Sequence, residues 1–467
     1  MSAQPPTEVT IVRGGHVLTM GGVGDLRDGA VALSAGSGTI LAVGPSAEVA
    51  NAFADAPVIG DERDVVMPGF INGHDHLSEA LISGLGETMS LYEWIERLIM
   101  PVIPLLDTEK ARVGTLLKGI EMLRSGITCV NDMFVHRNLG SHATLGVVDG
   151  LEQLGLRGVV SFGADDLPER LPIEQVMDEH EALADRVTNS KLVDFRLGIS
   201  TIQTMSDELL DASVSAARRF GWRVHSHLAE VREELTQSRL EFGASTLERA
   251  QRSGLLDVDV VFAHCIWVLE PDIQMLSTSR STVVHNPISN MILGSGVCPV
   301  PRIRAAGVPV GLGTDGSASN DSHDMLQVIK CAPLLQKLHH LDPGALTARD
   351  ALTMATIEGA RALGIDHLVG SLEAGKRADL IRFSGAGTRL AYVHDPYQQI
   401  AYCAGPGDVA DVWVDGRHVV RRGVVQTVSE SEVVHNARLL AAELFAAAGL
   451  AEHLAPSGGQ RAAREPS

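Results

Sequence analysis

Eight short apolar runs alternate with helix-length amphipathic stretches over residues 65–369 of this 467-residue chain. Such alternation is typical of strand–helix–strand units around a parallel sheet. Eight units in about 250 residues predict an α/β fold of the (β/α)8 TIM-barrel type, with a doubly wound open sheet as the alternative. The expected strands are Phe70–His76, Ile127–Met133, Gly158–Phe162, Phe195–Ile199, Arg223–His227, Val260–His264, Thr282–His285 and Pro309–Asp315, and the expected intervening helices include Asp207–Phe220 and Gly243–Ser253.

The two ends of the chain differ from this central region. Residues 1–64 and 370–429 hold short β-branched runs separated by glycine turns, a pattern that predicts strands. Because neither end supplies enough strands for a stable core, we expect them to pair in one small β-sandwich built from both termini. In residues 430–467 we expect a helix over 430–449 and a disordered tail from Pro456.

Composition and charge narrow the classes of partner. The chain has 38 Lys and Arg against 58 Asp and Glu, a net charge of −20, and only 4% aromatic residues. This balance argues against nucleic acids and anionic membrane surfaces. No apolar run reaches the roughly 18 residues of a spanning helix, and the start lacks the pattern of a signal peptide. We expect a cytoplasmic protein with five reduced cysteines and a small-molecule ligand.

Residues with metal-binding side chains end several of the expected strands. His74 and His76 lie two positions apart at the end of the first strand, so both side chains point into the barrel. His227, His264 and Asp315 end the fifth, sixth and eighth strands. Because barrel enzymes place their active sites where the parallel strands end, we expect these five side chains to converge at one rim.

Imidazoles and a carboxylate around a position left for water are typical of a catalytic transition metal, most often Zn²⁺ and sometimes Fe²⁺. Such a metal lowers the pKa of its bound water to about 7. Glu230 follows His227 by three residues and is expected to shuttle a proton. Spacing alone would make His264 a further ligand.

Five ordered motifs carry a resemblance to a known family. They are Pro68–His76, His225–Glu230, Ala263–Cys265, His285–Asn290 and Gly313–Gly316. In this order they resemble the motifs of the amidohydrolase superfamily, in the branch of S-adenosylhomocysteine and methylthioadenosine deaminases, guanine-type deaminases and s-triazine hydrolases. Leu372–Leu380 is similar to the segment that returns the chain to the flanking sandwich.

The resemblance implies a role for each matching residue. His74, His76, His227 and Asp315 would bind one divalent metal, with Asp315 also accepting a proton from water. Glu230 would relay a proton, and His264 would hydrogen-bond the hydroxide or the leaving group rather than bind the metal. Dinuclear relatives need a carboxylated lysine at the end of the fourth strand, and Phe195–Thr201 contains no lysine.

Four further residues are expected to border the substrate pocket, because they fall on strand-end loops or nearby segments: Trp94, His136, Gln203 and Asn290. His225 and His285 are expected to be structural, and Asp75 to support its neighbours from behind.

The implied reaction is hydrolytic deamination of an amino-substituted nitrogen heterocycle, with ammonia as the leaving group. Ile103 stands where nucleoside-specific relatives carry a ribose-binding carboxylate, and Ser200 replaces a histidine of theirs. These departures favour free bases and compact rings over nucleosides. The alternatives are an adenosine-type nucleoside deaminase, a hydrolytic dehalogenase that releases chloride from a triazine-like ring, and a catalytically silent scaffold. The resemblance also implies a homodimer or homotetramer.

Overall fold

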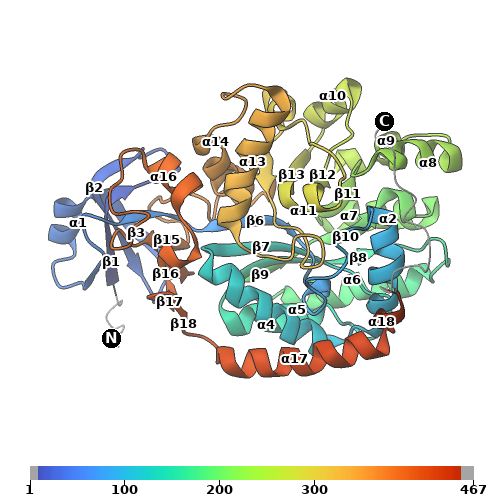
Figure 1. Ribbon diagram of the computed structural model, residues 1–467, viewed down its shortest axis with the longest axis horizontal. Helices are drawn as coiled ribbons and strands as arrows, with labels where there is room; N and C mark the ends of the chain where they lie inside the picture. Colours follow the sequence, from blue (N-terminus) through green and yellow to red (C-terminus); the bar gives the residue numbers. More distant parts are fainter. Residues whose placement is uncertain (1–8, 454–467) are drawn as a thin grey trace.

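The computed structural model describes residues 9–453, which form a barrel and a separate sheet built from both ends of the chain (Figure 1). The expected disorder from Pro456 lies outside the described residues. The sheet lies at the left of Figure 1 and the barrel at its centre and right. None of the helices in residues 9–453 has the length and hydropathy needed to cross a bilayer.

The barrel strands follow one another in sequence order, and all are parallel. They are β6 (Phe70–Asp75), β7 (Ile127–Phe134), β8 (Arg157–Ala164), β10 (Leu197–Thr201), β11 (Val224–Leu228), β12 (Val260–His264), β13 (Ser281–His285) and β14 (Val310–Leu312). The short β9 (Val193–Phe195) pairs with β8, so the expected fourth strand is split in two. The eightfold barrel prediction is confirmed, and the doubly wound alternative is wrong because the strand order within residues 9–453 does not reverse, as it would in a doubly wound sheet.

Helices surround this barrel and connect its strands: α4 (Thr108–Arg124), α5 (Leu145–Leu154), α6 (Ile173–Val187), α7 (Asp207–Phe220), α8 (Arg232–Phe242), α9 (Thr246–Ser253), α10 (Glu270–Thr278), α11 (Pro287–Ile292), α12 (Val300–Ala305), α13 (Met325–His340), α14 (Ala348–Met354) and α15 (Ile357–Ala362). Helix α7 has the predicted limits. Helix α9 begins at Thr246, later than predicted, because Ser245 accepts a hydrogen bond from the Glu248 backbone in a capping box.

Between β6 and α4 the chain forms short helical segments instead of one long helix. They are η1 (Leu77–Glu79), α2 (Leu91–Trp94), η2 (Ile95–Ile99), α3 (Met100–Val102) and η3 (Ile103–Leu105). Pro101 and Pro104 lie at the starts of the last two segments, and proline there breaks the run into short turns.

The terminal sheet joins the two ends of the chain. Its strands are β1 (Val9–Val17), β2 (Leu26–Ser34), β3 (Thr39–Pro45), β4 (Val58–Ile59), β5 (Val65–Pro68), β15 (Leu380–Phe383), β16 (Val409–Val414), β17 (Arg417–Arg421) and β18 (Val424–Val425), with α1 (Ser46–Ala52) after β3. Strand β5 lies between β1 and β15 and so connects the N-terminal strands to the C-terminal ones. The pairing of both termini in one separate sheet domain is therefore confirmed.

Two details of this domain differ from the expectation. The strands form one continuous nine-stranded sheet rather than two separate sheets, and an isolated bridge between Thr39 and Arg377 brings its β3 edge back to the segment before β15. In addition, Val65–Pro68 belongs to this sheet. The passage into the barrel therefore lies at Gly69 and not at residue 65.

The C-terminal part crosses back over the barrel. Helices α16 (Pro396–Cys403), α17 (Glu430–Ala447) and α18 (Leu450–His453) lie outside the two sheets, and the expected helix over 430–449 corresponds to α17. In Figure 1, α17 runs along the lower side of the barrel beside α4. The Arg124 guanidinium on α4 binds the Glu430 carboxylate at 2.6 Å.

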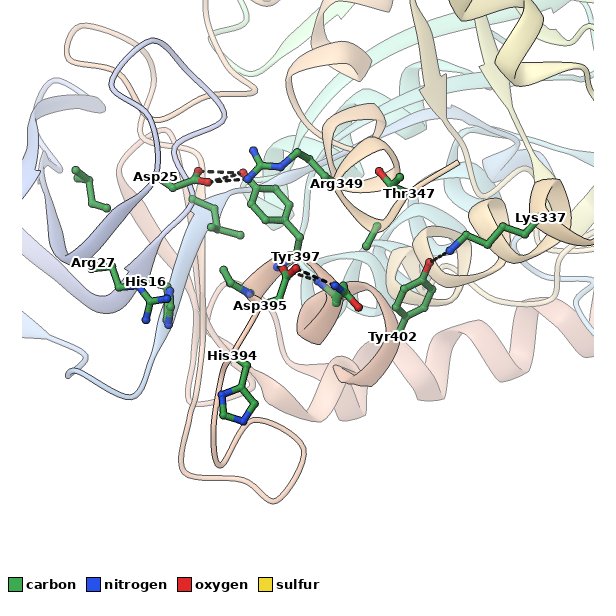
Figure 2. Close-up of a pocket in the computed structure, with 15 residues that line it drawn as sticks. His16, Asp25, Arg27, Lys337, Thr347, Arg349, His394, Asp395, Tyr397 and Tyr402 are labelled. Carbon is green, nitrogen blue, oxygen red and sulfur yellow. Dashed lines mark hydrogen bonds and ion pairs between the residues drawn. The ribbon is translucent and has the colours of Figure 1, made fainter. Parts of the chain in front are cut away.

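A surface cavity of about 620 Å³ lies where the terminal sheet meets α14 and α16 (Figure 2). There Asp25 accepts a hydrogen bond from the Tyr397 hydroxyl at 2.9 Å and binds Arg349 at 3.1 Å. These contacts hold the terminal sheet against the barrel. The strand-end histidines do not line this cavity.

Candidate active site

Three histidines from two barrel strands meet at the ends of those strands. His74 and His76 come from the end of β6 and His227 from β11, and their ring nitrogens lie within 4.8 Å of one another. The Nε2 atoms of His76 and His227 are 3.0 Å apart. His74, His264 and Asp315 form a second such group, so the structure brings together all five strand-end residues expected from the sequence.

The tautomers of these histidines show why a cation fits between them. His76 donates its Nδ1–H to the Met133 carbonyl at 2.7 Å, and His227 donates its Nδ1–H to the Ser200 carbonyl. A neutral imidazole with a proton on Nδ1 presents a lone pair at Nε2. Two lone pairs facing each other at 3.0 Å repel unless a positive ion lies between them. This pattern is the usual second hydrogen bond of metal-binding histidines.

Burial keeps His74 and His227 neutral. It lowers the pKa of His74 to about 4 and lowers that of His227 well below its usual value. The Nε2 atom of His74 is buried and has no hydrogen-bond partner within the described residues, and it lies 3.3 Å from Asp315 Oδ1. A buried donor or acceptor without a partner is costly. A metal bound by His74, His76, His227 and Asp315 would satisfy all four groups.

His225 lies directly behind His74, as the sequence predicts for a structural histidine. Its Nε2 is 2.8 Å from His74 Nδ1, and its Nδ1 is 3.2 Å from the Ser161 hydroxyl. His225 is fully buried one layer below the strand ends. It therefore fixes the ring of His74 and does not face the cavity.

Asp315 is the acidic member of the site. Burial alone would raise the pKa of this carboxyl, but the facing His74, His264 and His76 hold its pKa well below the usual range. Its backbone lies in the left-handed region at φ +64°, as does that of His264 at φ +71°. Such strain costs about 1 to 3 kcal/mol per residue and is concentrated at functional sites.

Glu230 lies on the wall of the same cavity. Its carboxylate is 3.7 Å from His264 Nε2, and burial raises the pKa of Glu230 to about 7. The same His264 nitrogen is 3.7 Å from Asp315 Oδ2. Burial lowers the pKa of His264, but the carboxylates of Glu230 and Asp315 outweigh this and hold it above its usual value. Glu230 can therefore gain or lose a proton near neutral pH, beside His264 and Asp315.

Two buried side chains position this trio, and spacing alone does not reveal either. The Glu234 carboxylate accepts hydrogen bonds from the backbone N–H groups of Ala229 and Glu230, each at 3.0 Å. It thereby fixes the turn that carries Glu230. Asn290 Oδ1 is 2.9 Å from His264 Nδ1 and accepts its N–H. In the sequence, Glu234 appears only as an acidic residue in the first turn of a helix, which does not distinguish it from a solvent-exposed one.

Asp75 supports the site from behind, in agreement with its expected role. Its carboxylate accepts hydrogen bonds from Asn72 at 2.7 Å and from the Thr314 hydroxyl at 2.9 Å, and it lies 3.0 Å from His323 Nε2. These contacts tie β6 to the residue that precedes Asp315.

The cavity above these residues has a volume of about 390 Å³, within the range of small-molecule sites. One end of it is lined by His76, His227, Glu230, His264 and Asp315. Elsewhere its surface is mainly apolar, although polar residues also contribute, and the apolar side chains include Ile82, Ile95, Ile99, Met100, Val102, Ile103, Val135 and Leu293. Apolar walls around a few polar groups suit a flat ring.

The four expected substrate contacts separate into two groups. Trp94 and Gln203 line the cavity, and the Gln203 amide is held by Tyr92 and Gln237. His136 and Asn290 do not belong to its lining. Because Val135 and Arg137 face the cavity, the intervening His136 points to the opposite side, where it packs on Phe162. Asn290 contacts His264 instead of the cavity.

The chain matches the amidohydrolase family over residues 65–419. It is 36% identical to the 5′-deoxyadenosine deaminase of Methanopyrus kandleri over 82% of this chain and 87% of that protein. It is 35% identical to the 5-methylthioadenosine/S-adenosylhomocysteine deaminase of Desulforudis audaxviator, over 93% of this chain and 99% of that protein.

Among solved structures, it resembles an adenosine deaminase from Xanthomonas campestris with bound zinc. The TM-score is 0.87 at 29% identity, over 94% of this chain and 98% of that one. The resemblance stated from the motifs is thereby confirmed. The chain belongs to the amidohydrolase family and is a hydrolytic enzyme for carbon–nitrogen bonds other than peptide bonds.

Proposed function

We propose that this enzyme is a metal-dependent deaminase that hydrolyses the amino group from the adenine ring of an adenosine derivative. One observation carries the proposal: Glu230 and Asp315 approach the same His264 nitrogen, each at 3.7 Å, on the wall of a mainly apolar cavity. A hydrolytic deaminase needs groups that take protons from water and return them to the ring and to the leaving nitrogen.

His74, His76, His227 and Asp315 would hold the metal, and we propose Zn²⁺, with Fe²⁺ as the alternative. The nitrogen and carboxylate donors suit either ion, and the Xanthomonas relative was solved with zinc. When bound, such an ion polarises water and lowers its pKa to about 7. The absence of a lysine from residues 195–201 at the end of the fourth strand supports a single ion.

The protein's own residues would then manage the protons. Glu230 takes one proton from the water and passes it to the ring nitrogen beside the amino-bearing carbon, while the water oxygen bonds to that carbon. Asp315 takes the second water proton, and His264 stabilises the new oxygen and helps to pass that proton to the amino nitrogen. The carbon–nitrogen bond breaks, ammonia leaves, and the ring carbon becomes a carbonyl. A pKa near 7 allows Glu230 both to accept a proton and to donate it.

The substrate proposed here is an adenosine derivative, whereas Ile103 led the sequence analysis to expect a free base. Ile103 does line the cavity and is buried, so no ribose-binding carboxylate is present at that position. However, Asp165 and Glu169 line the cavity from the loop after β8 and offer other acceptors for hydroxyl groups. The relatives from Methanopyrus kandleri and Desulforudis audaxviator are both named deaminases of 5′-modified adenosines.

Ammonia release tests this proposal directly. We would compare 5′-deoxyadenosine, adenosine, adenine, guanine and melamine, and measure chloride release from a chlorinated triazine in parallel. Ammonia from 5′-deoxyadenosine with a kcat/KM at least tenfold above that for adenine supports the proposal. A preference for adenine restores the free-base hypothesis, and chloride release without ammonia favours the dehalogenase.

The assembly and compartment complete the proposal. We propose a homodimer or homotetramer, and Leu334, Leu338 and Leu341 support it because they expose an apolar surface at α13. We also propose the cytoplasm, because the five cysteines are all unpaired. Light scattering of the purified protein would test the assembly, and a monomer would contradict it.

A further inference from the structure

The rim of the active-site cavity carries a charged cluster that the deamination chemistry does not use. Arg137, from the loop after β7, donates a hydrogen bond to the Asp165 carboxylate at 3.0 Å and another to the Glu169 carboxylate. It also donates to the Leu167 carbonyl at 3.3 Å. Both terminal nitrogens of this guanidinium are therefore already bound by acceptors of the protein.

This pairing leaves the rim acidic. Arg137 is the one arginine or lysine among the described residues that line the cavity, whereas Glu96, Asp165 and Glu169 are carboxylates of the same lining. Glu169 has 46% of its side chain exposed, and Glu96 is exposed as well, so both lie at the open end. Counting these four groups, the rim has a net charge of −2.

The rim lies where the part of the substrate remote from the leaving amino group would extend. The amino group that leaves must reach the buried end of the cavity, beside His76, Glu230 and Asp315. The remainder of an adenosine derivative then extends toward the exposed end, where Glu96, Glu169 and the Arg137–Asp165 pair lie.

We propose that this acidic rim makes the enzyme select adenosine derivatives whose 5′ substituent is cationic or uncharged, and discriminate against anionic ones. The inference rests on the proposed deaminase function and names the charge class of its substrate. An anionic substituent has no free cation to bind, because it would have to displace Asp165 or Glu169 from Arg137. A cationic substituent adds a favourable charge interaction at close range.

Three nucleosides of graded charge test the inference: 5′-amino-5′-deoxyadenosine, 5′-deoxyadenosine and adenosine 5′-monophosphate. Burial raises the pKa of Asp165 to about 6, with Arg137 opposing the shift, so an assay at pH 7.5 keeps this carboxylate ionised. We expect kcat/KM to fall in the order given, with the amine at least 100-fold above the phosphate. Raising the salt concentration from 0.05 to 0.5 M should reduce this ratio several-fold, because salt screens exposed charges.

Two variants separate charge from size. Glu169→Gln removes an exposed charge with little risk to folding, and Asp165→Asn removes the less exposed one. Each should lower the amine-to-phosphate ratio at least fivefold. Glu174→Gln is the matched control, because Glu174 is an exposed carboxylate in the first turn of α6 and does not line the cavity.

The outcomes are distinguishable. If the ratio is near one, or if neither Glu169→Gln, Asp165→Asn nor salt changes it, the charge inference is overturned while ammonia release still supports the deaminase. If none of the three nucleosides releases ammonia, the proposed function fails, and the inference fails with it.

Discussion

The backbone N–H of Asp315 donates a hydrogen bond to the carbonyl oxygen of His74 at 3.0 Å. This contact lies where the last barrel strand, β14, returns beside the first, β6. It therefore closes the barrel and, at the same time, fixes the spacing of the two side chains that face each other across the proposed metal site.

Asp315→Asn should abolish catalysis without unfolding the protein. The backbone bond to His74 does not involve the side chain, and asparagine tolerates the φ of +64° at this position. Removing the charge should lower the metal content and reduce turnover at least 10³-fold. Metal analysis and a melting curve would check both points. Asp321→Asn is the control, because Asp321 is exposed and has a similar φ of +61°. A fully active Asp315→Asn enzyme would refute the site.

Glu230→Gln should retain the metal and lose turnover. The side chain is not among the proposed ligands, but glutamine cannot carry the proton, so kcat should fall 10²-fold or more. Metal content and kcat measured on one preparation would separate the two effects. Near wild-type kcat would assign the proton transfer to another residue.

Glu234→Gln should also lower kcat and retain the metal, but the loss of kcat should be smaller than in Glu230→Gln. The Glu234 carboxylate accepts two backbone hydrogen bonds that hold the turn at Ala229 and Glu230, and a neutral amide can accept only one of them well. We expect kcat to fall about tenfold, with KM and metal content nearly unchanged. If the Glu230→Gln/Glu234→Gln double variant is no slower than Glu230→Gln alone, Glu234 acts through Glu230. Independent, multiplying losses would contradict this positioning role.

Asn290→Ala should lower kcat, because it leaves the ring of His264 less well oriented. Its Oδ1 accepts the Nδ1–H of His264 and so directs the other nitrogen toward Glu230 and Asp315. We expect kcat to fall about tenfold, and less than in His264→Ala. The double variant should resemble His264→Ala, since two residues that act as a unit are not additive. An unchanged kcat in Asn290→Ala would show that the ring needs no such support.

The strands and the convergence of the proposed metal ligands could be predicted because both follow from local pattern. Each of His74, His76, His227, His264 and Asp315 lies at or just beyond the end of an apolar run, and parallel strands end at one rim. The contacts that position them could not be predicted in this way. Asn290 lies 26 residues from His264, and their contact depends on how α11 packs beside β12.

The residues that the sequence analysis assigned to the wrong place can also be explained by local features of the chain. His136 lies beyond the last residue of β7, where alternation continues for a few residues and turns it away from the cavity. Val65–Pro68 resembles a barrel strand in composition, because a strand buried in either sheet is apolar. Only its pairing with β1 and β15 assigns it to the terminal sheet.

His180 on α6 should make the fold sensitive to acid. Its ring lies between Phe162 and Phe195, neither nitrogen has a hydrogen-bond partner within the described residues, and burial lowers its pKa to about 3. The unfolded chain binds a proton at this residue below about pH 6.5. The folded chain does not bind one until about pH 3. Stability is therefore fully present above pH 6.5 and is lost as the pH falls toward 3.

The size of this effect follows from linkage, at 1.36 kcal/mol for each pKa unit. Between pH 7.5 and 4.5, His180 should reduce the free energy of unfolding by about 2 to 3 kcal/mol. His180→Leu removes the titration and leaves the other histidines unchanged, so the variant should gain this amount relative to the wild type as the pH falls. Urea unfolding at both pH values would measure it, with His339→Leu at an exposed position as the control. A difference between wild type and His180→Leu that is the same at both pH values would mean that the buried ring already binds a proton in the folded protein.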